Sequence, residues 1–94
     1  VMSQKACRVE IRGRVTGVGF RFRTRSEARQ YPGLKGYVRN VAPGHVECVL
    51  QGDEGDVNSM LRWLREGPSP ADVEAFDVDP LPVSPDRAEF HVRM

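Results

Sequence analysis

The chain has 94 residues, of which 39% are hydrophobic and 29% charged, and its formal net charge is +1. This length supports one hydrophobic core and excludes a second domain, and the composition is that of a globular rather than a disordered or fibrous chain. No apolar run reaches the ~20 residues that a membrane-spanning helix needs, and the first residues lack the apolar stretch of a secretory signal, so we expect a cytoplasmic protein with no membrane partner.

Charge is distributed unevenly along the chain. Residues 1–40 contain ten Lys or Arg and two acids, whereas residues 41–94 contain four Arg and eleven acids. One interpretation is that the N-terminal half faces an anion, such as a phosphorylated metabolite, RNA or an acidic partner. The other is that the two halves neutralise each other across the fold.

The first third of the chain predicts a strand, a loop and a helix. Residues 7–12 alternate between apolar and polar, which is typical of a strand with one buried face. Residues 13–19 include three glycines and have no period, which indicates a loop. Residues 20–30 repeat an apolar or small residue every fourth position, as on one side of a helix that ends before Pro32. The side chains expected to face inward are Cys7, Val9 and Ile11 in the strand and Phe20, Thr24 and Ala28 in the helix.

The rest of the chain predicts a hairpin, a second helix and two further strands. Residues 34–41 and 45–51 are strands joined by a short Pro-Gly connection. Residues 53–66 form a helix with acids near its start, as the helix dipole prefers. Residues 73–78 form a weaker strand, and residues 88–93 alternate cleanly as the closing strand. The side chains expected to face inward are Val46, Cys48, Leu50, Val57, Met60, Leu61, Leu64, Ala88, Phe90 and Val92.

The order strand, helix, strand, strand, helix, strand with short connections predicts an α+β fold. It is that of the ferredoxin-like βαββαβ sandwich, in which an antiparallel sheet is covered on one face by two helices. Cys7 and Cys48 lie far apart with no CxxC spacing, so we expect two buried thiols rather than a disulfide or a zinc site.

The glycine-rich loop is a candidate anion site, because successive backbone amides and a helix N-terminus both favour negative charge. Arg21 stands where the helix begins, and its guanidinium is suited to two phosphoryl oxygens. A structural turn beside a surface arginine is the alternative. The segment lacks the Lys-Ser or Lys-Thr of a Walker loop and the glycine spacing of a dinucleotide-binding loop, and no cysteine is placed to act as a phosphatase nucleophile.

Residues 13–21, which read Gly-Arg-Val-Thr-Gly-Val-Gly-Phe-Arg, resemble the phosphate-loop signature of the acylphosphatase family. Residues 36–40, Gly-Tyr-Val-Arg-Asn, followed by Gly44-His45-Val46 and Gly52, resemble its second signature. The resemblance extends to Trp63 and to the closing strand around Phe90. It therefore covers residues 1–94 as a single acylphosphatase-like domain.

The resemblance implies an enzyme, an acylphosphatase, that hydrolyses the carboxyl-phosphate bond of acyl phosphates to carboxylate and inorganic phosphate. By matching position, Arg21 would bind the phosphoryl group and Asn40 would position the attacking water. The family uses neither a metal nor a cofactor, and its partner is a small-molecule acyl phosphate. The residues expected to bind the substrate phosphate are Arg14, Val15, Thr16, Gly17, Val18, Gly19 and Phe20. We expect a monomer, because the sequence predicts no large exposed apolar stripe that a second chain would cover.

The chain departs from the family pattern at a few positions. Thr16 stands where the family usually has Gln, and since the loop backbone does most of the binding, we expect this change to tune activity rather than abolish it. Tyr37 replaces the commoner Trp, residues 30–33 form a slightly longer stretch, and the last residue is Met94 where the family often has Tyr.

Acyl-phosphate chemistry suits a site with few side chains. The leaving group is a carboxylate whose conjugate acid has a pKa of ~4, so no general acid is required. Charge stabilisation and placement of the water then suffice. Neither signature contains a His or a carboxylate, and we hypothesise that a substrate phosphoryl oxygen accepts the proton of the water.

Other interpretations of the same residues stay open at this point. Asn40 is also a plausible turn residue, and His45 and His91 are expected on exposed polar faces rather than as ligands. The other arginines of this region either form a solvated face or steer anions to the loop, namely Arg14, Arg23, Arg25 and Arg29. RRM domains share this element order, but the third strand lacks the aromatics that stack on RNA bases, so we expect no nucleic-acid partner. A regulatory domain that lost catalysis, or the acylphosphatase-like domain of a larger carbamoyl-transfer protein, are further alternatives.

Overall fold

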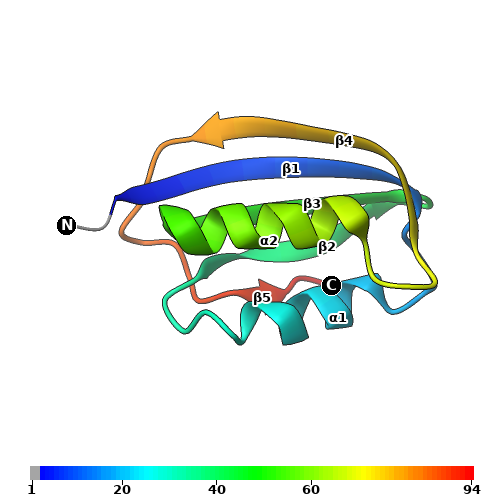
Figure 1. The fold of residues 1–94 in the computed structure, drawn as a ribbon, viewed down its shortest axis with the longest axis horizontal. Coiled ribbons are helices and arrows are strands. Elements are labelled where there is room, and N and C mark those ends of the chain that lie inside the picture. Colours follow the sequence, from blue (N-terminus) through cyan, green and yellow to red (C-terminus); the bar gives the residue numbers. More distant parts are fainter. Residues whose placement is uncertain (1–2) are drawn as a thin grey trace.

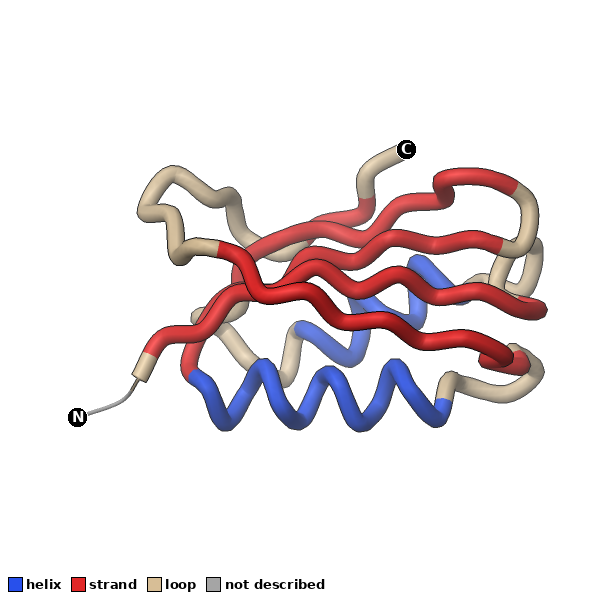
Figure 2. The backbone as a smooth tube through the Cα atoms, turned by 90° about the horizontal axis from the view of Figure 1, so that it is seen from above, coloured by secondary structure: helices blue, strands red, loops and turns tan. Residues whose placement is uncertain are grey.

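The computed structural model describes residues 3–94. Two helices pack on one face of a five-stranded sheet whose strand order is β4-β1-β3-β2-β5. The elements in chain order are β1 (Gln4–Arg14), α1 (Phe20–Ala28), β2 (Lys35–Ala42), β3 (His45–Asp53), α2 (Glu54–Glu66), β4 (Asp72–Leu81) and β5 (His91–Val92). Figure 1 shows both helices in front of the sheet, and Figure 2 shows the two layers from above. This is the predicted ferredoxin-like arrangement.

The core lies between the sheet and the helices, and most side chains predicted to face inward are buried there. Every predicted inward side chain of β1, α1 and β3 is buried, and so are Val57, Met60 and Leu64 of α2. Leu61 is only half-buried and packs against the edge of this core. Cys7 and Cys48 are free, buried thiols as predicted. Burial raises the pKa of Cys48 well above its ordinary value, and it also raises the pKa of Cys7, against the opposing charge of Lys5.

The closing part of the chain differs from its prediction. The strand expected over residues 88–93 is reduced to His91–Val92, which pairs in parallel with β2, so the sheet is mixed rather than purely antiparallel. Ala88 is exposed instead of inward, whereas Phe90 and Val92 do pack against the core. The reason is that β4, which runs over Asp72–Leu81 and is longer than predicted, already pairs antiparallel with the outer edge of β1. The end of the chain therefore pairs with the opposite edge of the sheet, which is the outer edge of β2.

Both histidines are half-buried rather than exposed as expected. His45 pairs with Glu10, and the Nδ1 of His91 lies 2.8 Å from the backbone oxygen of Glu89.

Between residues 3 and 94, no helix is long and apolar enough to cross a membrane.

Candidate active site

The loop between β1 and α1 is fixed by its apolar side chains, while its glycines turn the backbone. Val15 and Phe20 are both 1% exposed and belong to the core, and Phe20 also packs near the Trp63 ring of α2, with 6.4 Å between ring centroids. Gly17 and Gly19 have φ values of 73° and 74°, a left-handed conformation that is costly for residues with a Cβ. Both positions face open space, so the glycines are required by the backbone and not by crowding.

The amino end of α1 is open to an anion. Its N-cap is Gly19, none of the side chains of residues 3–94 caps it, and its first turn contains no acid. Within the described part of the chain, none of the backbone amides of residues 16–20 donates a hydrogen bond to the protein. α2 is the opposite case, since the Asp53 carboxylate accepts from the Gly55 amide and the first turn carries two acids. Unpaired amides and an uncompensated helix dipole make the start of α1 suited to a phosphoryl group.

Arg21 lies one residue inside α1 and is half-buried. Its Nη1 donates to the thioether sulfur of Met94 at 3.5 Å, and its guanidinium lies 5.7 Å from the centroid of the Phe22 ring. A thioether is a weak acceptor, and Met94 is 88% exposed. The Arg21 guanidinium is therefore held only by weak contacts, which a phosphoryl oxygen would readily replace.

Asn40 lies near the end of β2, opposite Val46 of β3. The pairing of the two strands shifts register directly after Asn40, and irregularities of this kind commonly re-aim a side chain next to an active site. The Asn40 side chain is exposed and makes no hydrogen bond within residues 3–94, so it does not cap the hairpin turn. This observation removes the interpretation of Asn40 as a turn-capping residue.

Two hydrogen bonds join the end of β1 and the loop that follows it to the hairpin that carries Asn40. The Gly13 amide donates to the Gly44 carbonyl at 3.1 Å, and the Gly44 amide donates to Thr16 Oγ1 at 3.0 Å. Thr16 and Asn40 consequently line one hollow of about 330 Å³, together with Val41, Ala42 and Pro43. Arg21 does not line that hollow. The structure thus brings Thr16 and Asn40 together and leaves Arg21 at the neighbouring start of α1.

A buried carboxylate, which the sequence analysis did not identify, holds β2 against β3 beside Asn40. Glu47 Oε1 accepts from Arg39 Nε and from the Tyr37 hydroxyl, both at 2.8 Å. Burial alone would raise the pKa of Glu47, but these two hydrogen bonds and the Arg39 charge outweigh it and place the pKa below its ordinary value. Burial and the Glu47 carboxylate raise the pKa of Tyr37. Arg39 lies opposite Glu47 because the pairing of the strands shifts between Asn40 and Ala42, and no pattern in the sequence predicts that shift.

The remaining predicted phosphate-binding residues lie along the same segment. Arg14 is the last residue of β1 and is exposed, while Val18 is half-buried and packs against the core. Among the described residues, no group of three or more His, Cys, Asp or Glu side chains is arranged to hold a metal ion.

Comparison with known proteins agrees with this geometry. Residues 7–92 match the family model described as Acylphosphatase. An acylphosphatase from Rubrobacter xylanophilus is 44% identical over 95% of this chain and 80% of its own length. The structure of an acylphosphatase from Coxiella burnetii superposes with a TM-score of 0.86 at 33% identity, covering 96% of this chain and 93% of that one.

A longer protein contains a similar unit. The crystal structure of full-length HypF in its phosphate- and nucleotide-bound form also gives a TM-score of 0.86, at 29% identity, but the match covers all of this chain and only 12% of HypF. The family model and the close relatives lead to one conclusion. The chain belongs to the acylphosphatase family and is an enzyme that hydrolyses acyl phosphates.

Proposed function

We propose that the enzyme hydrolyses the carboxyl-phosphate bond without a metal ion, that residues 14–20 and Arg21 hold the phosphoryl group, and that Asn40 positions the attacking water. The observation that carries this proposal is the set of unpaired amides at residues 16–20, which stand at an uncapped helix start beside an arginine. Three negative phosphoryl oxygens need several donors at once, and backbone amides together with a forked guanidinium supply them.

The hydrogen bonds between the loop and the hairpin support the role of Asn40. Through Gly44 and Thr16 they fix the hairpin relative to the phosphate loop, and a free Asn side chain offers both a donor and an acceptor to a water molecule. The water oxygen attacks phosphorus as the bond to the acyl oxygen breaks, and the bonding electron pair leaves with the carboxylate. A phosphoryl oxygen takes the proton of the water, because the leaving carboxylate needs none.

Two further properties are proposed for the enzyme, namely that it acts as a monomer and that it resides in the cytoplasm without a nucleic-acid partner. The large exposed apolar side chains are spread over α1, β2, β4 and the segments that follow β4 and β5, which supports a monomer: Phe22, Val41, Val78, Val83 and Met94. Size-exclusion chromatography with light scattering tests the monomer, since a mass of twice 10.6 kDa would contradict it.

The test of the mechanism is hydrolysis of benzoyl phosphate in the presence of a chelator. We expect turnover by the parent and loss of most activity in Arg21→Ala and Asn40→Ala. Arg23→Ala is the matched control, because Arg23 lies on the same helix and its guanidinium already donates to a protein group, the Ser69 carbonyl. A folded parent that needs a metal, or an Arg23→Ala variant as impaired as Arg21→Ala, would contradict the proposed roles.

A further inference from the structure

Three arginines follow one another along one side of α1. Arg21, Arg25 and Arg29 are spaced four residues apart, so their side chains emerge from the same face. Each step along the helix is about 6 Å. Arg21 is at the phosphate end of this row, and the other two extend it away from the loop.

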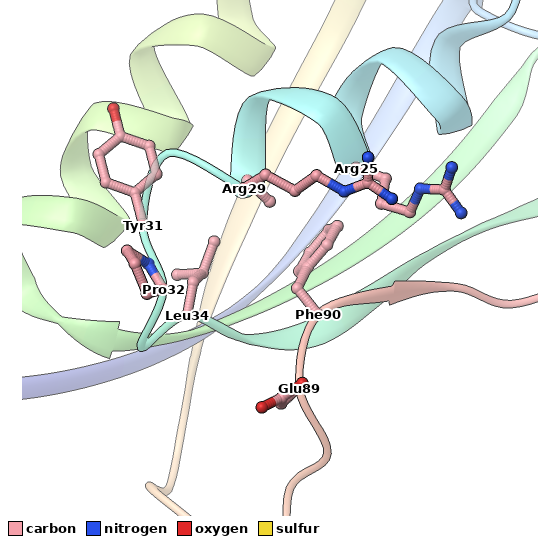
Figure 3. Close-up of a pocket in the computed structure, with 8 residues that line it drawn as sticks. Arg25, Arg29, Tyr31, Pro32, Leu34, Glu89 and Phe90 are labelled. Atoms are coloured by element: carbon pink, nitrogen blue, oxygen red, sulfur yellow. The ribbon is translucent and has the colours of Figure 1, made fainter.

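The guanidinium of Arg25 leans back toward Arg21. It lies 5.8 Å from the centroid of the Phe22 ring, and the Arg21 guanidinium lies 5.7 Å from the same centroid. Figure 3 shows the side chains of Arg25 and Arg29 extended in the same direction along the helix. Helical side chains normally point toward the amino end, which here is the end with the phosphate loop. Two cationic groups therefore flank one exposed ring next to the proposed phosphoryl site.

The positive charge of Arg25 is not neutralised by a carboxylate. The ion pairs within residues 3–94 are Arg39 with Glu47 and His45 with Glu10. Arg25 lines a pocket of about 260 Å³ with Arg29, and the acid of that pocket is Glu89. In Figure 3 the Glu89 side chain lies on the far side of Phe90 and is turned away from both guanidinium groups.

The accessible donors of Arg25 are its two terminal nitrogens. Its Nε is buried without a hydrogen-bond partner within the described part of the chain, so a ligand cannot reach that atom. The terminal nitrogens are not among the buried unpaired atoms of residues 3–94, and both remain free to donate. A planar carboxylate can occupy two donors of a guanidinium at once, so it is the group that best complements this side chain.

Resting on the proposed function, we infer that Arg25 binds a carboxylate on the acyl half of the substrate, and that the preferred substrates are acyl phosphates of short dicarboxylic acids. The phosphoryl group lies at the loop and Arg21, and the acyl chain runs along α1. After one helical turn its terminal carboxylate meets Arg25. Arg29 adds positive potential behind Arg25.

Succinyl phosphate and butyryl phosphate are the probes. Their acyl chains have the same number of carbons and differ at the end, where one has a carboxylate and the other a methyl group. We expect the ratio of kcat/KM for succinyl phosphate to that for butyryl phosphate to fall about fivefold in Arg25→Gln, which is the effect of losing one part-exposed ion pair. Arg25→Lys keeps the positive charge but loses the paired donors of the guanidinium, and its ratio is expected between those of the parent and Arg25→Gln.

Arg23→Gln is the control, because it removes the same charge from the same helix at a side chain that donates to the Ser69 carbonyl. Its ratio should equal that of the parent. An unchanged ratio in Arg25→Gln, or an equal fall in Arg23→Gln, would overturn the inference. A circular dichroism spectrum that differs from that of the parent would show that Arg25→Gln does not fold correctly, and Arg25→Lys is then the test variant. A succinyl-to-butyryl ratio of kcat/KM in Arg25→Lys below that of Arg23→Gln supports the inference, and an equal ratio overturns it.

The substrates also separate this inference from the proposed function. A parent that hydrolyses neither compound would refute the proposed function itself. A parent that hydrolyses both compounds, with a ratio that no substitution at Arg25 changes, would refute only the role of Arg25.

Discussion

Replacing Thr16 with valine tests whether the hydroxyl of this residue holds the loop and the hairpin together. Valine has nearly the same shape but no oxygen, so the substitution removes the acceptor of the Gly44 amide, which donates to Thr16 Oγ1 at 3.0 Å. Thr16 and Gly44 are both half-buried. The variant therefore leaves a partly buried amide without its partner while the packing volume stays the same.

The expected loss of stability follows from these contacts. A typical hydrogen bond contributes ~1 kcal/mol net, and a donor left buried and unpaired costs ~1–3 kcal/mol. Because Gly44 is half-buried and keeps some access to water, we expect the lower value, ~1 kcal/mol. For a domain of this size, that corresponds to a fall in Tm of about 4–8 °C.

Activity should respond as well, because the same bond fixes Asn40 relative to the phosphate loop. We expect kcat for benzoyl phosphate to fall more than KM rises, since the amides that hold the phosphoryl group remain. Thr16→Ser keeps the hydroxyl and is the control. In a double-mutant cycle, Thr16→Val and Asn40→Ala should be non-additive in kcat. The reasoning would be refuted if Thr16→Val had the Tm and the kcat of the parent.

Three further predictions concern the hairpin, the loop and the core. The lowered pKa of Glu47 means that its stabilising effect is present above its unfolded pKa, near 4.5, and is lost as the pH falls through the folded value. In urea unfolding, the difference in the free energy of unfolding between the parent and Glu47→Gln should therefore shrink in acid. A difference that stays constant with pH would contradict this. Gly19→Ala places a Cβ at a φ of 74°, so we expect a loss of ~1 kcal/mol and a raised KM, whereas Ser26→Ala in the exposed middle of α1 should change neither. The thiols of Cys7 and Cys48 are buried and have raised pKa values, so neither should react with a thiol reagent such as DTNB in the native enzyme. Both should react in urea. Rapid reaction of the folded protein would contradict this, because it would show that one thiol is accessible.

Periodicity predicted those parts of the fold in which each element buries one face. The alternation around Val9 and the helical spacing of Val57, Met60 and Leu64 both match the core. The prediction of the closing strand was wrong in part, because alternation indicates which side chains are buried but does not indicate which strand pairs with the segment. Phe90 and Val92 do pack against the core, yet only His91–Val92 pairs as a strand, and in parallel with β2.

The parts of the site that the sequence missed depend on contacts between distant residues. Thr16 and Gly44 are 28 positions apart, and no local pattern shows that a hydroxyl in the loop accepts from an amide in the hairpin. Glu47 faces away from the side of β3 that was predicted to be apolar. It is nevertheless buried, because Arg39 and Tyr37 cover it and donate to it.

The central claim is that the unpaired amides of residues 16–20 and Arg21 hold the phosphoryl group, and titration of the ¹⁵N-labelled enzyme with inorganic phosphate tests it most directly. We predict saturable shifts of the amide signals of residues 16–20 in the parent, and a much weaker affinity at the same amides in Arg21→Ala. Shifts confined to the amide signals of other arginines, such as Arg8 and Arg93, which line a separate hollow over the sheet, would contradict the claim, and so would a parent that binds no phosphate.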